Sequence, residues 1–365
     1  MHISIIGAGI SGLMSALELV EQGCQVDLYD GQDQGQASWA GGGILSPMYP
    51  WRYPHAVNVL AQPAEAMYQK WNEHLKAYTG IDVEIHQTGM LIFDESDQAI
   101  GVRYADLTQN AYQHASMLQA NELAAQFPLL HPNLKQAVHF SKLSNIRNPR
   151  LMNALKSYLS QHQHVRYLQQ KVMGIEQQHG RISHLKLING TCQAVDQVLF
   201  TAGAWSGQWL ETLGIRFEVQ PIHGQMMVFK APANWLNTMC MNRIMYLIPR
   251  RDGHIVCGSS MRMQDFNLGL NPETSADIYA ASLAIVPELS RWPVIKEWAG
   301  FRPGSQTGIP VIGQSPRFNN AWVNTGHFRN GLCMAPASAQ LIRQLILAQD
   351  TSTDATAYRP IAIEC

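Results

Sequence analysis

Residues 2–30 read HISIIGAGISGLMSALELVEQGCQVDLYD. The stretch begins with an apolar run that predicts a parallel strand, and a Gly7-x-Gly9-x-x-Gly12 motif follows directly. A helix with apolar side chains at positions 13, 14, 17 and 20 comes next, and a second apolar strand then ends in Asp30. This order is typical of a Rossmann βαβ unit that binds a dinucleotide.

Each residue of the motif has its own physical task. Gly7 makes the tight turn, Gly9 lets the backbone approach a pyrophosphate, and Gly12 lets the helix pack closely on the strand. Asp30 follows Gly12 by 18 residues, the spacing at which a carboxylate accepts hydrogen bonds from a ribose. The pyrophosphate is expected at the positive N-terminal end of the helix. The motif alone does not distinguish FAD from NAD, and a glycine-rich turn without a nucleotide is the structural alternative.

The composition indicates a compact globular chain. With 365 residues it has room for two domains or one large α/β unit. Lys and Arg number 26 against 27 Asp and Glu, so the chain has no electrostatic footprint for nucleic acid or for an anionic membrane. Polar residues interrupt the apolar runs well short of a membrane span.

The beginning of the chain and its cysteines suggest a cytoplasmic protein. The apolar strand pattern begins at Ile3 without a basic segment or a cleavable apolar stretch, so we expect no export. The six cysteines are scattered and form no C-x-x-C pair, which is typical of reduced thiols. The histidines show no metal-binding spacing, so no metal site is predicted.

Several later segments complete the coarse picture. The stretch ASWAGGGILSPMYP (37–50) is built from small residues and predicts a loop whose backbone N–H groups face a large planar ligand. Strands are predicted at 81–93, 217–230, 243–250, 254–258 and 321–326, and DQVLFTAGAWSG (196–207) predicts another that ends in Thr201-Ala-Gly203. Helices are predicted at 148–163 and 272–286. After GHFRNG (326–331) a long apolar run predicts a buried helix with Pro336 in its opening turn.

At this point the chain resembles the D-amino acid oxidase-like flavoproteins, and within them the bacterial glycine oxidases of thiamine biosynthesis. The resemblance runs nearly end to end, through the motif at 7–12, ASWAGGG, TAGAWSG, MYLIPR (245–250), WAGFRPGS (298–305) and GHFRNG. It implies an α/β fold in which a Rossmann-type FAD-binding domain is interleaved with a substrate domain built on a large mixed or antiparallel sheet. The implied cofactor domain takes residues 1–80, 147–215 and 305–365, and the substrate domain takes 81–146 and 216–304.

The resemblance also implies which residues contact noncovalently bound FAD. Beyond the motif residues named above, they are Ile10, Ser11, Gly31, Ala37, Ser38, Gly42, Gly43, Ile44, Val172, Gly203, His327, Phe328, Arg329, Asn330, Gly331, Leu332 and Cys333. Gly331 has to be small for close backbone approach. The N-terminus of the following helix can then stabilise negative charge on the reduced flavin.

Four residues are implied at the substrate. Arg302 matches the arginine that binds the substrate carboxylate, a role suited to its planar guanidinium. Tyr246 matches a tyrosine whose hydroxyl meets the same carboxylate, Met261 matches a pocket-wall position, and Arg329 faces the ligand. The structural alternatives are an Arg302 paired with Glu297, a core tyrosine and a core methionine.

The sequence does not assign a role to three further residues, one histidine and two arginines. His223 is either a general base or a structural histidine, and nothing in the sequence assigns chemistry to Arg147 or Arg150.

The implied activity is FAD-dependent oxidation of glycine, sarcosine or D-alanine to an imine and then a 2-oxo acid. Molecular oxygen would be the acceptor, hydrogen peroxide the product, and the glycine imine would feed thiazole synthesis. A D-amino acid or secondary-amine dehydrogenase with another acceptor is the alternative within the enzyme class. A flavin-binding module of a tRNA-modifying enzyme and a nucleotide-binding protein without chemistry are alternatives outside it. A homo-oligomer is possible.

Overall fold

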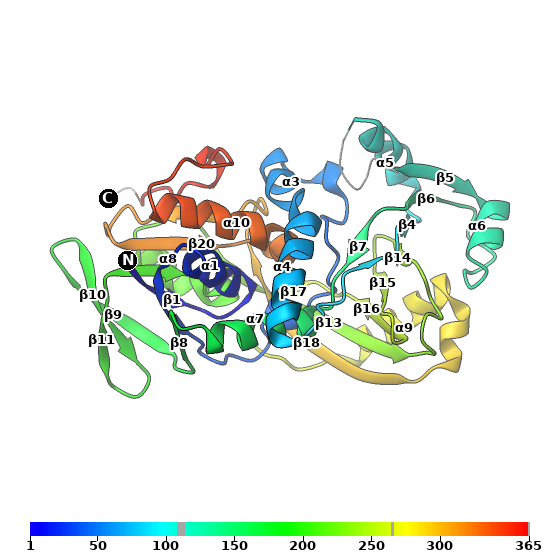
Figure 1. Cartoon of the computed structure of the whole chain (residues 1–365). Coiled ribbons are helices and arrows are strands. Elements are labelled where there is room, and N and C mark those ends of the chain that lie inside the picture. Colours follow the sequence, from blue (N-terminus) through cyan, green and yellow to red (C-terminus); the bar gives the residue numbers. More distant parts are fainter. Residues whose placement is uncertain (108–113, 264–265, 364–365) are drawn as a thin grey trace.

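The computed structural model describes residues 1–107, 114–263 and 266–363 and forms an elongated molecule with one sheet system at each end (Figure 1). Both chain termini lie in the same half, beside a six-stranded sheet. The order of its strands is β19-β20-β12-β1-β2-β8, and all neighbours are parallel except β19 and β20. The strands are β1 (His2–Ile6), β2 (Gln25–Tyr29), β8 (Val165–Leu168), β12 (Gln197–Phe200), β19 (Val311–Gln314) and β20 (Ala321–Thr325).

This half of the molecule has three layers. One face of the sheet shares an apolar core with five helices, which include α1 and α10 side by side in Figure 1. They are α1 (Ile10–Val20), α3 (His55–Ala61), α4 (Ala64–Thr79), α7 (Asn148–Gln161) and α10 (Gly331–Ile346). The other face packs on a three-stranded antiparallel sheet and on α8 (Gly207–Thr212). That small sheet contains β9 (Val172–Gln178), β10 (Arg181–Leu187) and β11 (Cys192–Ala194).

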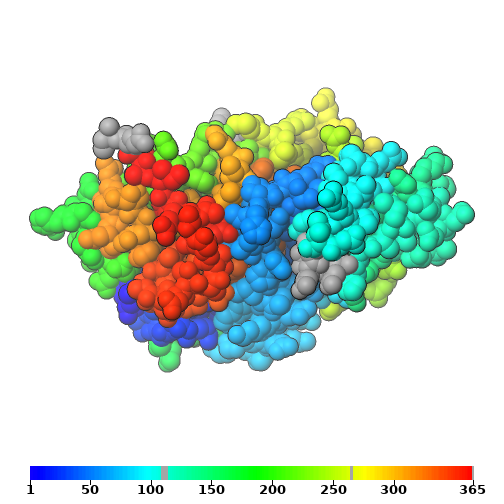
Figure 2. Space-filling model, turned by 90° about the horizontal axis from the view of Figure 1, so that it is seen from above, coloured from blue at the N-terminus to red at the C-terminus, as the bar shows by residue number. Residues whose placement is uncertain are grey.

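The other half is built on a nine-stranded mixed sheet in which only β4 and β14 pair in parallel. Its strands are β4 (Met90–Ile92), β5 (Ala115–Gln119), β6 (Gln136–Phe140), β13 (Gln220–Lys230), β14 (Met239–Met241), β15 (Tyr246–Pro249), β16 (His254–Gly258), β17 (Arg262–Met263) and β18 (Val294–Gly304). Helices α5 (Glu95–Leu107), α6 (Ala120–Gln126) and α9 (Pro272–Ile285) cover it, and α5 and α6 lie at the far end in Figures 1 and 2. The predicted α/β fold class, with its separate mixed sheet, is confirmed.

The chain crosses between the halves four times. Every strand of the six-stranded sheet falls within residues 1–80, 147–215 or 305–365, and every strand of the nine-stranded sheet falls within 81–146 or 216–304. An ionic cluster joins the halves: Arg147, at the start of α7, lies 3.1 Å from a Glu84 carboxylate oxygen and 2.7 Å from one of Asp252. Arg150 lies 3.4 Å from the same Glu84 oxygen, so both arginines have structural partners.

The strand predicted over 81–93 and the predicted place of Pro336 differ in the structure. The predicted strand over 81–93 is broken into β3 (His86–Gln87) and β4, and β3 pairs only with β7 (Ser144–Asn145) among the described residues. Pro336 is the sixth residue of α10 and not part of its opening turn. A proline there leaves the carbonyl of Leu332 without its helical donor. The buried Tyr68 hydroxyl supplies the missing hydrogen bond at 2.8 Å, which explains why the proline is tolerated.

The described cysteines carry no disulfide, and four of the five are buried. Cys365 lies outside the described residues. No helix in the described part of the chain is both long enough and apolar enough to cross a membrane.

Helix α1 and strand β1 touch at Gly12. A Cβ added there would lie 1.9 Å from the carbonyl oxygen of Gly7 and 2.7 Å from Oγ1 of Thr201, and a backbone oxygen cannot move aside cheaply. We expect Gly12→Ala to destabilise the cofactor-free protein by about 1–3 kcal/mol or more, as overpacked cores do. Urea unfolding measures the change. Gly9→Ala is the control, because its methyl group would meet only Ser38 Oγ, at 3.3 Å. Equal midpoints for the two variants would contradict the packing role of Gly12.

Candidate active site

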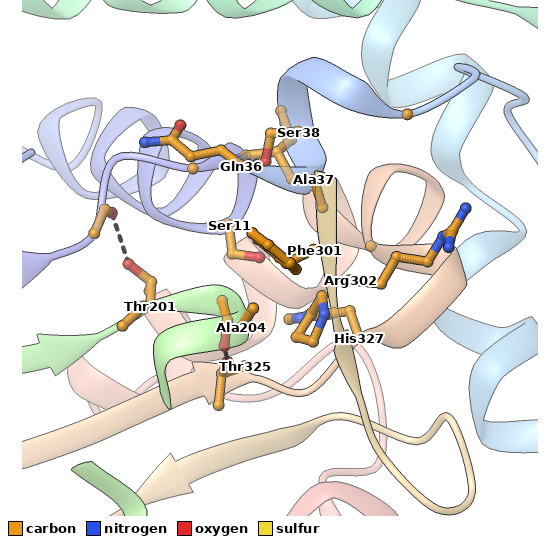
Figure 3. Close-up of a pocket in the computed structure, with 18 of the residues that line it drawn as sticks. Ser11, Gln36, Ala37, Ser38, Thr201, Ala204, Phe301, Arg302, Thr325 and His327 are labelled. Atoms are coloured by element: carbon orange, nitrogen blue, oxygen red, sulfur yellow. Dashed lines mark hydrogen bonds between the residues drawn. The ribbon is translucent and has the colours of Figure 1, made fainter. Parts of the chain in front are cut away.

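A large pocket lies where β1 and β12 end and α1 begins, and it continues to the edge of the nine-stranded sheet. Figure 3 shows the labelled residues surrounding it from separate elements. They include Ser11 on α1, Ala37 and Ser38 on α2 (Ala37–Ala40), Thr201 after β12, and Phe301 and Arg302 on β18. Segments far apart in the sequence therefore form a single cavity.

The glycine turn closes one end of the pocket. Gly7 has a φ of +110°, a conformation that a residue with a side chain rarely adopts, and its N–H donates to the Tyr29 carbonyl at 3.0 Å. The Thr201 hydroxyl donates to the Gly7 carbonyl at 2.8 Å, which ties β12 to the turn. Gly9 also lines the pocket, and because it has no side chain only its backbone faces the cavity. The turn has the shape that the sequence motif predicts.

Asp30 lines the same end of the pocket, but its carboxylate already has protein partners. Lys156 Nζ lies 2.8 Å and the Tyr167 hydroxyl 2.5 Å from Oδ2, and the Gln32 N–H donates to Oδ1 at 3.0 Å. Burial alone would raise the pKa of Asp30, but these hydrogen bonds outweigh burial and hold it below its ordinary value. The group is thus an anchored carboxylate, and Oδ1 keeps a lone pair for a ligand hydroxyl.

The small-residue stretch 37–50 forms the wall beside α1. It begins with the short helix α2 and is not wholly the predicted loop. The hydroxyl of Ser38 accepts from the N–H of Ile10 at 2.9 Å, and the indole of Trp298 donates to the Ala40 carbonyl at 3.0 Å. Both halves of the molecule therefore hold this wall in place.

The segment before α10 forms the opposite wall. Phe328 lines the pocket with a φ of +48°, which is uncommon for a residue with a bulky side chain. His327 is buried, its Nε2 lies 3.2 Å from the Ser338 hydroxyl, and burial lowers its pKa to about 4. Cys333 is buried as well, and burial raises the pKa of its thiol to about 12. Neither side chain is charged at neutral pH.

Arg302 projects into the part of the pocket that β18 borders. Its Nη2 lies 2.5 Å from the Ser259 hydroxyl and its Nη1 lies 3.2 Å from the Ser260 carbonyl. No ion pair joins it to a carboxylate among the residues that the structure describes, and Glu297 instead accepts from the Ser275 hydroxyl. Burial lowers the pKa of Arg302, the neighbouring Tyr246 hydroxyl acts against this shift, and the charge of Arg329 acts with it. The pocket thus contains a partly desolvated guanidinium for which the described part of the chain offers no anion.

Tyr246 lies beside this guanidinium. Its side chain is buried, and its hydroxyl interacts with the Arg302 guanidinium and lies 3.7 Å from the sulfur of Met226. Arg329 is exposed at the pocket mouth, with Nη2 3.8 Å from the sulfur of Met48. A tyrosine hydroxyl and two guanidinium groups therefore line the same cavity. This arrangement suits a small carboxylate ligand.

The structure brings nearly all predicted site residues to this pocket. Every predicted cofactor residue except Gly12, which lies behind the turn, lines it, and so do Tyr246, Arg302 and Arg329. The predicted place of Met261 in the pocket wall differs in the structure. Its side chain is 56% exposed and does not line the pocket. After Ser260, which contacts Arg302, the chain leaves the pocket for the edge strand β17. His223 packs behind Phe301, with ring centroids 5.9 Å apart, and is not part of the lining either.

Several lining residues were not predicted from the sequence: Gln36, Met48, Asn148, Trp205, Ser259 and Phe301. Met48 belongs to the small-residue stretch already singled out, and Phe301 precedes Arg302, so proximity to a motif was the available signal. Asn148 and Ser259 gave no such signal, because tertiary contacts alone bring them to the cavity.

The match to a known family decides the class of protein. The family model DAO, described as FAD dependent oxidoreductase, matches residues 2–345. The chain belongs to this family.

Individual relatives agree with this assignment. A glycine oxidase from Pseudomonas putida is 38% identical over 364 residues, and the match covers 98% of each chain. A bifunctional ThiO/ThiG protein from Synechocystis is 28% identical, and the match covers 98% of this chain but 53% of that protein. The crystal structure of the glycine oxidase from Geobacillus kaustophilus superimposes with a TM-score of 0.91 at 22% identity, covering 98% of each chain, which shows a shared fold.

The pocket fits the FAD of a DAO-family enzyme. A Cβ added to Gly203 would meet no atom within 4 Å, and one added to Gly331 would meet only His327 Cβ at 3.4 Å. Both glycines therefore leave open space in the pocket that they line. Gln36, Asn148 and Asn330, all in the pocket wall, each keep a buried polar atom without a partner. A large ligand with many polar groups can supply such partners.

The buried His327 makes the stability of the FAD-free protein depend on pH. Its pKa is about 4 when folded and its ordinary value is 6.5, so the unfolded chain takes up a proton first as the pH falls. Stability is therefore lost between about pH 6.5 and pH 4, by about 3 kcal/mol from this group. Urea unfolding of the parent and of His327→Gln across this range measures the contribution. The parent should lose more stability than the variant, and parallel curves would contradict the assignment.

Proposed function

We propose that this DAO-family protein oxidises glycine and small relatives such as sarcosine and D-alanine, with oxygen as acceptor. The observation that carries the proposal is the partly buried Arg302 guanidinium, which faces the pocket and forms no ion pair with a carboxylate of the described residues. A buried charge without a partner costs several kcal/mol. A substrate carboxylate supplies that partner through two parallel hydrogen bonds.

The chain's own residues bind and orient the substrate in this proposal. Arg302 and the Tyr246 hydroxyl hold the carboxylate, and Arg329 adds positive charge at the mouth. Bound FAD supplies the two-electron acceptor for the α-hydrogen of the amine. Holding the α-carbon in place is the main task of the protein, because hydride transfer depends on positioning.

The overall reaction is balanced by water and oxygen. Glycine loses two electrons and two protons to give an imine, which water converts to glyoxylate and ammonia. The electrons and protons reduce oxygen to hydrogen peroxide. The relatives named glycine oxidase and ThiO/ThiG support this substrate and favour a place in thiamine synthesis, where the imine is consumed before water reaches it.

We propose that the FAD is held without a covalent bond. The thiol best placed for attachment, Cys333, lies inside α10, its sulfur is 3.2 Å from the Asn330 carbonyl, and burial keeps it protonated. A thiol attacks only as the thiolate. Acid precipitation should therefore leave a white pellet and a yellow supernatant, and a yellow pellet would refute noncovalent binding.

The substrate proposal is tested with a panel of amines. We expect kcat/KM, measured as peroxide release under identical oxygen, to be higher for glycine and sarcosine than for D-phenylalanine. A side chain without room costs roughly 1–3 kcal/mol through overpacking, which exceeds the hydrophobic gain of a small group. A preference for D-phenylalanine would make the protein a general D-amino acid oxidase. Turnover with a dye acceptor but no peroxide would favour the dehydrogenase alternative.

Gly224 offers a sharper test of the role of Arg302. It lies on β13 beside the Arg302 guanidinium, and an added Cβ would come within 2.2 Å of Nη1 and 2.6 Å of Cζ. We expect Gly224→Ala to fold and bind FAD, because the end of an arginine side chain can move. The guanidinium then leaves the carboxylate, so kcat/KM for glycine should fall by about tenfold or more.

The control for this variant is Gly174→Ala on strand β9. Its methyl group would meet nothing closer than Lys186 Cδ at 3.8 Å, so it adds the same group without a clash. If Gly224→Ala retains the parental kcat/KM, Arg302 does not need its observed position, and the proposed carboxylate anchor is wrong.

A further inference from the structure

Arg250 is a second guanidinium near the cofactor pocket; it is 3% exposed and contacts the lining residue Gly42 from behind. It follows strand β15 directly, four residues after Tyr246. Burial lowers the pKa of Arg250 to about 10, which leaves it charged at neutral pH. The nearby carboxylates of Glu84 and Asp252 are both bound to Arg147. No carboxylate forms an ion pair with Arg250 within the described ranges 1–107, 114–263 and 266–363.

The partners of Arg250 are neutral oxygen atoms. Nη1 donates to Asn145 Oδ1 at 2.5 Å and to the Ile146 carbonyl at 2.9 Å, and Nη2 donates to the Gly42 carbonyl at 2.7 Å. The Ile146 N–H in turn donates to the Gly43 carbonyl at 2.8 Å. Arg250 and its neighbour Ile146 therefore bind both carbonyl groups of the Gly42–Gly43 segment.

This anchoring sets the direction of the peptide between the two glycines. In a trans peptide the N–H points opposite to the C=O, so the Gly43 N–H points away from Arg250. Gly42 and Gly43 both line the cofactor pocket, and no acceptor for the Gly43 N–H occurs among the described residues. Gly43 has a φ of +86°, and a Cβ there would lie 2.1 Å from the Ile146 carbonyl oxygen, so only glycine fits.

The segment lies at the substrate end of the pocket. A Cβ added to Gly42 would lie 2.8 Å from the ring of Tyr246 and 2.7 Å from Ile248. The glycine turn at Gly7 and the carboxylate of Asp30 form the other end, where the dinucleotide part of FAD belongs. The reactive ring of FAD therefore belongs near Gly42, because substrate and ring have to meet.

We propose that Arg250 is a positioning residue for the cofactor, which aims the Gly43 N–H into the pocket and favours negative charge on the reduced flavin. A cation that binds a peptide oxygen polarises the N–H of the same peptide, and such polarisation is strong in a low-dielectric interior. The role rests on the proposed function only in assuming that the flavin ring meets the substrate beside Tyr246.

The test compares Arg250→Gln, Arg250→Lys and the control Arg251→Gln, all loaded with FAD. Arg251 is adjacent in sequence, but its side chain is half exposed and contacts the Ile85 carbonyl. Flavin reduction is measured at equilibrium with a reference dye, without any amine substrate. We expect the equilibrium constant for reduction to fall by about tenfold or more in Arg250→Gln and by less in Arg250→Lys, which keeps the charge. Arg251→Gln should match the parent.

A further variant separates charge from shape. Asn145→Asp places a carboxylate against Arg250 and neutralises its charge with the arginine still present, although two long hydrogen bonds from Asn145, to His86 and Thr88, are lost. Asn145→Asp should also make flavin reduction less favourable. This result would still test the proposal if Arg250→Gln failed to fold. Parental equilibrium constants in Asn145→Asp and in any folded Arg250 variant, with only lower thermal stability, would overturn the proposal. Because the readout needs no amine, it is independent of whether glycine is the substrate.

Discussion

The guanidinium of Arg302 occupies the space that Gly224 leaves by having no side chain. This contact requires β13 and β18 to run side by side, and the two strands pair along nearly their full length, from Gln220 opposite Gly304 to Phe229 opposite Val294. The same strand β18 donates the Trp298 hydrogen bond to Ala40, which fixes the wall of small residues beside the cofactor pocket. One strand thus carries Arg302, the proposed carboxylate anchor, and joins the nine-stranded sheet to the cofactor-binding half.

A neutral chain can still present strong positive charge locally. Lys and Arg nearly balance Asp and Glu overall. Yet the partly buried Arg302 lines the cofactor pocket, and the buried Arg250 lies behind Gly42 in its wall. Neither forms an ion pair with a carboxylate of the described residues, whereas the carboxylates of Glu84 and Asp252 pair with Arg147. Because the desolvation of an unpaired charge is costly, such sites persist where a ligand or a reaction uses the charge. The proposed carboxylate substrate and a reduced flavin are both anions that such positive charge would stabilise.

The cofactor-binding half could be predicted from the sequence because its signals are local. The turn at Gly7, the helix after it and Asp30 lie within one short stretch, and the family resemblance extends from them. The roles of Gly224 and Arg250 could not be predicted, because each depends on a segment far away in the chain that only the folded sheet brings close. The exposed position of Met261 has the same origin, because a sequence match does not show where the chain turns away from the pocket before the edge strand β17. Pro336 was misplaced within its helix because the compensating hydroxyl belongs to Tyr68, on α4.

The central claim is that the unpaired guanidinium of Arg302 selects a substrate by its carboxylate. The most direct measurement compares anaerobic bleaching of the FAD-loaded protein by glycine with bleaching by methylamine, the same amine without the carboxylate. Glycine should bleach the flavin absorbance, and methylamine at equal concentration should leave it oxidised. Bleaching of equal extent and rate by the two amines would contradict the claim, because the carboxylate would then contribute nothing to binding or orientation.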